Sequence, residues 1–237
     1  MRILITNDDG IEAGGIIRLA AAAAAFGEVW VVAPDRGRSA ASHCITLHSP
    51  IDIFPHEFPV PGVHAFSCTG MPADCVRVGS LSVMPEKPDV VLSGINYGHN
   101  VASDIQYSAT IGAALEASFQ GIRGIALSEG ADPDHSVTDA YLLPVLEKWI
   151  GSGIPEGQIL NINFPKCPLA ECRGILEDRT VSKSVPFTDR YREIEKLPGG
   201  GARFMVDGLY REEAEEGSDF RALIDRYISA GFVRNLC

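Results

Sequence analysis

Hydrophobic residues in the first third of the chain follow two different periodicities. Residues 2–6 and 28–33 are short, nearly continuous apolar runs, whereas residues 13–26 are alanine-rich with apolar positions at helical spacing. Short apolar runs predict strands buried on both faces, and the helical spacing predicts a helix that covers them. This order is a βαβ unit, and Pro34 ends its second strand.

The same alternation of strand and helix signals continues to about residue 165. Further strands are predicted at 88–93, 124–128 and 158–164, helices at 72–81, 107–120 and 138–150, and extended segments at 44–54 and 63–68. Alternating strands and helices favour an α/β fold with a Rossmann-like, doubly wound and mostly parallel sheet.

The pattern changes in the C-terminal part of the chain. Residues 167–217 are rich in charge, glycine and proline, and Gly199-Gly200-Gly201 predicts the tip of a β-hairpin arm. Residues 219–229 predict a closing helix. We expect a single domain over residues 1–237, with a core of about 1–165 and a projecting arm and C-terminal element of about 166–237.

Composition limits the classes of protein that the chain resembles. It has 46% hydrophobic and 22% charged residues and a net charge of -11. These values are typical of a soluble enzyme, and the negative charge argues against binding long nucleic acids. The longest apolar stretch, residues 16–26, contains Arg18 and is too short to span a bilayer, so we expect no membrane partner.

The cysteines indicate a reducing compartment. No pair has CxxC spacing, and no secretory signal precedes the first strand, so we expect a cytoplasmic protein with reduced thiols. A local bridge between Cys167 and Cys172 is the alternative. The six cysteines are Cys44, Cys68, Cys75, Cys167, Cys172 and Cys237.

An acidic turn, Asn7-Asp8-Asp9-Gly10, follows the first predicted strand. Two adjacent carboxylates repel each other unless a cation, hydrogen-bond donors or water offsets their charge. The turn alone is compatible with a solvated turn, a metal or phosphate site, or a helix N-cap.

Three further loops favour the metal interpretation. Residues 33–42, 93–100 and 104–112 are rich in side-chain oxygens, and each follows or precedes a predicted core element. Strand carboxyl ends meet at one edge of a parallel sheet, so we expect these loops to converge. A hard cation such as Mg²⁺ or Mn²⁺ prefers such oxygens, and zinc is less favoured.

These segments together resemble the SurE family, the stationary-phase survival proteins that act as nucleotide phosphatases. The resemblance covers residue 1 to about 124 most closely and is patchier beyond it, where 160–163 (Leu-Asn-Ile-Asn) is its clearest fragment. The matching motifs are TNDDG at 6–10, APDR at 33–36 followed by Ser39, TGMPADCV at 69–76, SGINYGHN at 93–100, Asp104, and YSAT at 107–110.

The resemblance implies the residues of the site. It implies one divalent ion per subunit, Mg²⁺ or Mn²⁺, held by Asp8, Asp9, Ser39 and Asn96. It implies phosphate binding by Asn96 and by the turn Ser108, Ala109 and Thr110, with Asp8, Asp9 and Asp104 as catalytic residues. From the residues alone, two carboxylates neutralise a dication, and neutral Ser39 and Asn96 oxygens leave coordination positions open.

The resemblance also implies an activity and an assembly. The activity is hydrolysis of nucleoside 5′-monophosphates, with 3′-monophosphates and short polyphosphate as further substrates. The nucleophile is either a water activated at the metal, with Asp8 or Asp9 as base, or one of these carboxylates. The family forms homodimers or homotetramers that exchange C-terminal elements, and here the arm around Gly199 is the expected exchange unit.

Several of these residues also have simpler interpretations. Ser108 or Thr110 can cap the helix at 107–120, although its start would also hold a phosphate on the helix dipole. Arg36 and Arg38 either clamp phosphate or are solvated and paired with nearby acids. Asp104 either transfers a proton or is a helix-start carboxylate.

The chain also departs from the family pattern. Ala40, Ala102 and Ala109 stand where many relatives carry glycine, and a methyl group there would narrow the approach to phosphate or prevent a positive φ. A haloacid-dehalogenase-type phosphatase requires DxD spacing, which the adjacent Asp8 and Asp9 lack. A non-catalytic nucleotide-binding or regulatory module on the same fold is the remaining alternative.

Overall fold

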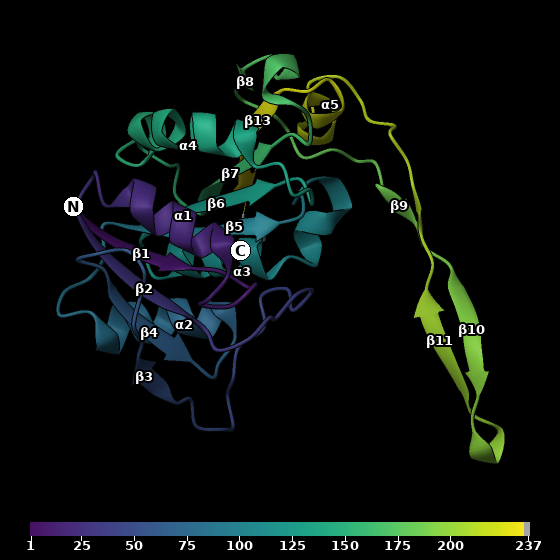
Figure 1. Cartoon of the computed structure of the whole chain (residues 1–237), viewed down its shortest axis with the longest axis horizontal. Helices are drawn as coiled ribbons and strands as arrows, with labels where there is room; N and C mark the ends of the chain where they lie inside the picture. The colour runs from purple at the N-terminus through teal and green to yellow at the C-terminus, as the bar shows by residue number, and fades with distance from the viewer. Residues whose placement is uncertain (235–237) are drawn as a thin grey trace.

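A nine-stranded sheet forms the centre of the computed structural model, which describes residues 1–234 (Figure 1). Its strands, in spatial order, are β3 (Ile53–Pro55), β4 (His64–Cys68), β2 (Glu28–Pro34), β1 (Arg2–Thr6), β5 (Val90–Tyr97), β6 (Arg123–Glu129), β7 (Gln158–Phe164), β13 (Ile228–Arg234) and β8 (Ile175–Leu176).

The strands from β4 to β7 are all parallel. Their order 4-2-1-5-6-7 turns back between β1 and β5, because the chain winds outward from β1 first in one direction and then in the other. The predicted doubly wound, mostly parallel α/β fold is therefore confirmed. Its switch point lies between the ends of β1 and β5.

Helices cover both faces of the sheet. On one face α1 (Gly14–Ala23) and α4 (Ser136–Trp149) share a buried apolar cluster with the inner strands. On the other face α2 (Pro72–Val78) and α3 (Ala109–Phe119) pack on β1, β2 and β5. The remaining helical segments are η1 (Gly79–Val83), η2 (Ala102–Gln106), η3 (Leu169–Glu171), η4 (Pro198–Gly200) and α5 (Asp219–Ile224).

The predicted β-hairpin arm projects from this body (Figure 1). It consists of β9 (Phe187–Thr188), β10 (Tyr191–Lys196), β11 (Ala202–Val206) and β12 (Leu209–Tyr210). The strands pair β10 with β11 and β9 with β12, both antiparallel. Gly199 and Gly200 form the tip at φ values of 75° and 82°, which favour glycine.

Three expected elements differ in the structure. The closing helix predicted over 219–229 ends at Ile224, and residues 228–234 form β13, which pairs antiparallel with β7. Within the extended segment expected at 44–54, the only strand residues are in β3, Ile53–Pro55. The helix expected at 72–81 ends at Val78 and continues as the wider turn η1.

The structure also tests the predicted state of the cysteines and the expected absence of a membrane-spanning helix. Cys44, Cys68, Cys75, Cys167 and Cys172 are free, so the alternative bridge between Cys167 and Cys172 does not form. Cys237 lies outside the described residues. Over residues 1–234, no helix combines the length and the apolar character that crossing a membrane requires.

Candidate active site

The candidate site is a cavity of about 220 Å³ at the switch point of the sheet. Ligands of doubly wound folds bind at this place, because adjacent loops diverge there and leave a crevice. The predicted loops converge as expected. The residues that line the cavity are Asp8, Asp9, Ser39, Ala40, Asn96, Tyr97, Asn100, Asp104, Tyr107 and Ser108.

Asp8 lines this cavity two residues after the end of β1, with 4% of its surface exposed. Its Oδ1 accepts a hydrogen bond of 2.5 Å from the Thr110 hydroxyl. Burial raises the pKa of Asp8 to about 6, and the charge of Asp9 adds to the rise while the bond from Thr110 opposes it. In the absence of a cation, burial therefore destabilises the ionised form of Asp8 relative to the protonated form.

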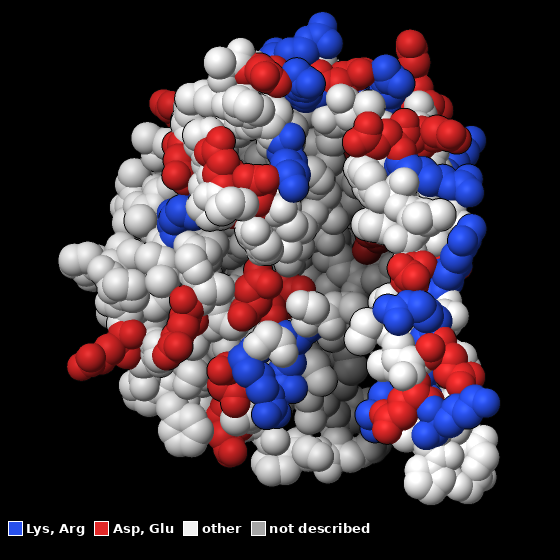
Figure 2. Space-filling view, turned by 45° about the vertical axis from the view of Figure 1, so that its right-hand side comes forward, with Lys and Arg blue, Asp and Glu red and all other residues white. Residues whose placement is uncertain are grey.

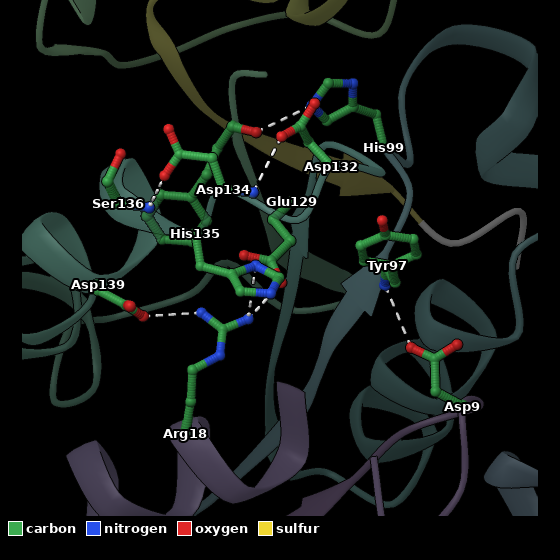
Figure 3. Close-up of polar contacts among 11 residues, drawn as sticks. Asp9, Arg18, Tyr97, His99, Glu129, Asp132, Asp134, His135, Ser136 and Asp139 are labelled. Carbon is green, nitrogen blue, oxygen red and sulfur yellow. Dashed lines mark hydrogen bonds and ion pairs between the residues drawn. The ribbon is translucent and has the colours of Figure 1, made fainter. Parts of the chain in front are cut away.

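Asp9 is half-buried beside Asp8, and Figure 3 shows its carboxylate below the backbone of Tyr97. Its Oδ2 accepts a 3.1 Å hydrogen bond from the Tyr97 N–H. Burial raises the pKa of Asp9, and the charge of Glu129 raises it further. Within residues 1–234, no lysine or arginine forms an ion pair with either carboxylate. Two uncompensated carboxylates are what a dication would neutralise.

Glu129 belongs to a charged cluster behind Tyr97 (Figure 3). It ends β6, is 4% exposed, and pairs with Arg18 of α1 and with the His135 Nδ1 at 3.1 Å. The His135 ring in turn packs edge-on against Tyr97, with centroids 6.4 Å apart. This cluster therefore supports the segment whose N–H group holds Asp9.

The loop after β2 brings Ser39 to the cavity. The Arg38 N–H donates to the Asp8 carbonyl at 2.7 Å, which fixes this loop to the acidic turn. The Arg38 side chain donates to the Thr69 carbonyl at 2.7 Å and pairs with Asp35 at 3.5 Å. Arg36 lies 3.8 Å from the Asp35 carboxylate. Both arginines therefore pair with a nearby acid, the simpler of the two interpretations, and neither lines the cavity.

Asn96 enters the cavity from the end of β5. Its Nδ2 donates to the Gly98 carbonyl at 2.8 Å, so its side-chain oxygen is the atom left for a ligand. Nearby, Asn100 is buried and held by β7: its N–H donates to Asn163 at 2.8 Å, and its carbonyl accepts from Asn161 at 2.8 Å. The Leu-Asn-Ile-Asn fragment at 160–163 is thus an anchor for the β5 loop.

At the start of α3, Ser108 caps the helix and also faces the cavity. This residue is the N-cap, since its hydroxyl accepts from the Ile111 N–H at 3.1 Å, and it also lines the cavity. Ala109 and Thr110 are fully buried behind it. Thr110 does not cap the helix but binds Asp8. The first N–H groups of a helix have no intrahelical acceptor, so this end can receive an anion.

Asp104 lies in η2 at the rim of the cavity. Its carboxylate accepts from the Ser103 hydroxyl at 3.3 Å, and its carbonyl accepts from the Tyr107 and Ser108 N–H groups. Burial raises the pKa of Asp104. A carboxyl group with a raised pKa that lines a cavity is suited to proton transfer.

Two of the three alanines that replace a family glycine have a positive φ, although the methyl group of alanine disfavours this conformation. Ala40 has a φ of 56° and Ala102 a φ of 52°. The left-handed region costs an alanine about 1–2 kcal/mol, so the surrounding contacts must impose these turns. Ala109 is instead an ordinary first residue of α3.

Three lining residues were not singled out from the sequence, namely Tyr97, Asn100 and Tyr107. All three lie inside the motifs at 93–100 and 107–110, which is the signal that identifies them. Within the described part of the chain, no group of three or more His, Cys, Asp or Glu side chains could hold a metal. The Asp8 and Asp9 carboxylates share the cavity with neutral Ser39 and Asn96, and oxygen donors of this kind fit a hard cation.

Comparison with known proteins finds relatives of one family. The family model described as survival protein SurE matches residues 3–185. A protein named 5′-nucleotidase SurE from Synechococcus sp. (strain JA-3-3Ab) is 39% identical over 97% of this chain and 90% of its own length. One of the same name from Thermosipho melanesiensis is 36% identical, over 97% and 89%.

A solved structure extends the comparison to the fold. The crystal structure of the SurE protein from Aquifex aeolicus superimposes with a TM-score of 0.84 at 32% sequence identity, covering 100% of this chain and 95% of that one. The chain therefore belongs to the SurE family.

Proposed function

We propose that this protein is a divalent-metal-dependent nucleotidase that hydrolyses nucleoside 5′-monophosphates to nucleoside and phosphate. The observation that carries the proposal is the pair Asp8 and Asp9, which share one cavity with Ser39, Asn96 and the start of α3. The relatives named 5′-nucleotidase SurE support the same activity.

Asp8, Asp9, Ser39 and Asn96 would hold one Mg²⁺ or Mn²⁺ ion. When bound, the ion supplies positive charge that polarises the phosphoryl oxygens of the substrate. Thr110 orients Asp8 through its hydroxyl, and the Tyr97 N–H orients Asp9. Both bonds stabilise the ionised carboxylates that a cation requires.

The phosphoryl group would lie between Asn96 and the first turn of α3. The N–H groups of Ala109 and Thr110 and the positive end of the helix dipole favour its negative charge. Asp104, which lines the same cavity, is placed to donate a proton to the nucleoside oxygen as its bond to phosphorus breaks.

Phosphate release from a panel of substrates tests this function. The panel contains nucleoside 5′- and 3′-monophosphates and short polyphosphate, each with Mg²⁺, with Mn²⁺ and with chelator. We expect release from 5′-monophosphates that stops when the metal is chelated. Turnover that is indifferent to chelator would contradict the metal role, and nucleotide binding without any turnover would indicate a binding module instead.

We also propose that the arm assembles the protein into homodimers or homotetramers in the cytoplasm. An isolated two-stranded ribbon is marginally stable, and here β10 and β11 are exposed along their whole length, with Phe204 at 56% and Val206 at 61%. Both side chains lie on the same face of β11, which a second copy would cover. Within residues 1–234 the five cysteines are free thiols, which supports a reducing compartment.

The double substitution Phe204→Asp and Val206→Asp should convert the oligomer to monomers, because it places two charges in the apolar contact. Light scattering after size exclusion measures the mass. Arg192→Ser, a polar change on the paired strand β10, serves as the control and should keep the wild-type mass. A monomeric wild-type protein, or a double variant of unchanged mass, would contradict arm exchange.

A further inference from the structure

A second cavity, of about 690 Å³, adjoins the candidate active site at the base of the arm. We call it the arm-root pocket; the residues that define it are Gly98, His99, Asp104, Phe187, Tyr210 and Phe220. Asp104 lines both cavities, so the two cavities adjoin each other at this residue. Figure 2 shows the hollow between the body and the arm, with charged side chains on both of its sides.

Aromatic rings form one wall of the arm-root pocket. Phe187 of β9 and Tyr210 of β12 face each other across the strand pair, with centroids 5.3 Å apart and planes tilted by 52°. Tyr210 also packs edge-on against Phe220 at 6.0 Å. Phe187 and Tyr210 nevertheless remain 42% and 52% exposed. Exposed aromatic faces that border a cavity are suited to stacking on a flat ring.

The charged groups at the pocket argue against a second phosphate there. Arg226 pairs with Glu171, and Lys166 pairs with Asp132 at 3.2 Å, so both cations are already neutralised. Glu212 and Asp104 add negative charge. The Nε2–H group of His99 donates to the Phe164 carbonyl at 2.9 Å, and burial lowers the pKa of this histidine. A neutral ring with polar edges fits these surroundings, whereas an anion does not.

We propose that the arm-root pocket binds the nucleoside part of the substrate, with Phe187 and Tyr210 stacking on the base. This inference rests on the proposed function and deepens it, because it explains how the enzyme would prefer nucleotides to other phosphomonoesters. Phe187 and Tyr210 are then specificity residues that lie away from the reacting phosphoryl group. The arm thereby contributes to the site from positions that lie 79 and 102 residues beyond Ser108 in sequence.

Comparison of two substrates on the same full-length protein tests this inference. kcat/KM is measured with Mg²⁺ for adenosine 5′-monophosphate and for glycerol 2-phosphate, which lacks a base. In Phe187→Ala and in Tyr210→Ala we expect the ratio of the two values to fall about tenfold, through KM for the nucleotide, because one stacking contact is lost. The ratio cancels any loss of folded or assembled protein.

Phe54→Ala is the matched control, since Phe54 is an exposed aromatic residue that lies outside the pocket and outside the arm. Its ratio should equal that of the wild type. Adenosine binding to the metal-free protein, followed by calorimetry, gives a second measurement, and we expect both pocket variants to lose affinity.

The possible failures are distinguishable. If the wild type hydrolyses neither substrate, the proposed function is wrong. If it hydrolyses both, and the two pocket variants keep the wild-type ratio and adenosine affinity, the inference about the pocket is overturned while the phosphatase activity stands. A wild-type ratio near one would overturn it as well.

Discussion

Replacement of Asp9 by asparagine should lower kcat for adenosine 5′-monophosphate by about a thousandfold or more, because it removes one of the two negative charges that we propose to hold the cation. The change is nearly isosteric. The asparagine oxygen can still accept the hydrogen bond that the Tyr97 N–H donates to Asp9 at 3.1 Å, so the fold should persist. Phosphate release and calorimetric titration with Mn²⁺ measure activity and metal affinity on the same preparation.

Asp35→Asn is the matched control for this experiment. Asp35 follows the neighbouring strand β2, is exposed and pairs with Arg36 and Arg38 outside the cavity. We expect its activity to stay within about twofold of the wild type, as for a surface ion pair. An Asp9→Asn protein that kept both turnover and Mn²⁺ affinity would show that the cation is bound elsewhere.

Replacement of Asp8 by asparagine should stabilise the metal-free protein at pH 7 although it abolishes turnover. The pKa of Asp8 is raised from 3.8 to about 6 by burial. The folded state therefore binds the proton more tightly than the unfolded state, and the stability of the metal-free protein falls as the pH rises from about 4 to about 6. Two pKa units correspond to about 3 kcal/mol, which is an upper limit for the gain in the variant.

Urea unfolding in chelator at pH 4.5 and pH 7 measures this effect. The wild type should lose stability between the two values by more than Asp8→Asn does, and Asp35→Asn should behave like the wild type. Added Mn²⁺ should reverse the order at pH 7, since only the wild type gains stability from the ion. An identical pH dependence of stability in the wild type and in Asp8→Asn would show that the ionised Asp8 carboxylate does not destabilise the metal-free protein.

The inner part of the fold could be predicted because its strands are buried on both faces. The strand predicted at 2–6 matches β1, and that at 158–164 matches β7. Parallel strands place their following loops at one edge, and this rule alone brings Asp8, Ser39 and Asn96 together. The sequence motifs in these loops contain most of the residues that line the cavity, so most of the lining could be predicted from sequence.

The outer part depends on contacts that local pattern does not contain. Residues 228–234 carry several small side chains and become a strand because β7 offers an edge to pair with. Gly231 is needed there, since a Cβ at this position would lie 2.0 Å from the Arg179 carbonyl. The pairing of Arg18 with Glu129 joins residues 111 positions apart, and the arm-root pocket likewise joins distant segments.

The left-handed turns at Ala40 and Ala102 bear on how the site meets its ligands. The left-handed conformation is unfavourable for an isolated alanine, so the packed structure around each turn must impose it. Ala40 borders the cavity, and Ala102 begins the segment that leads to Asp104. The loops are consequently preorganised: their shape exists before a ligand arrives, and little of the binding free energy is spent on ordering them.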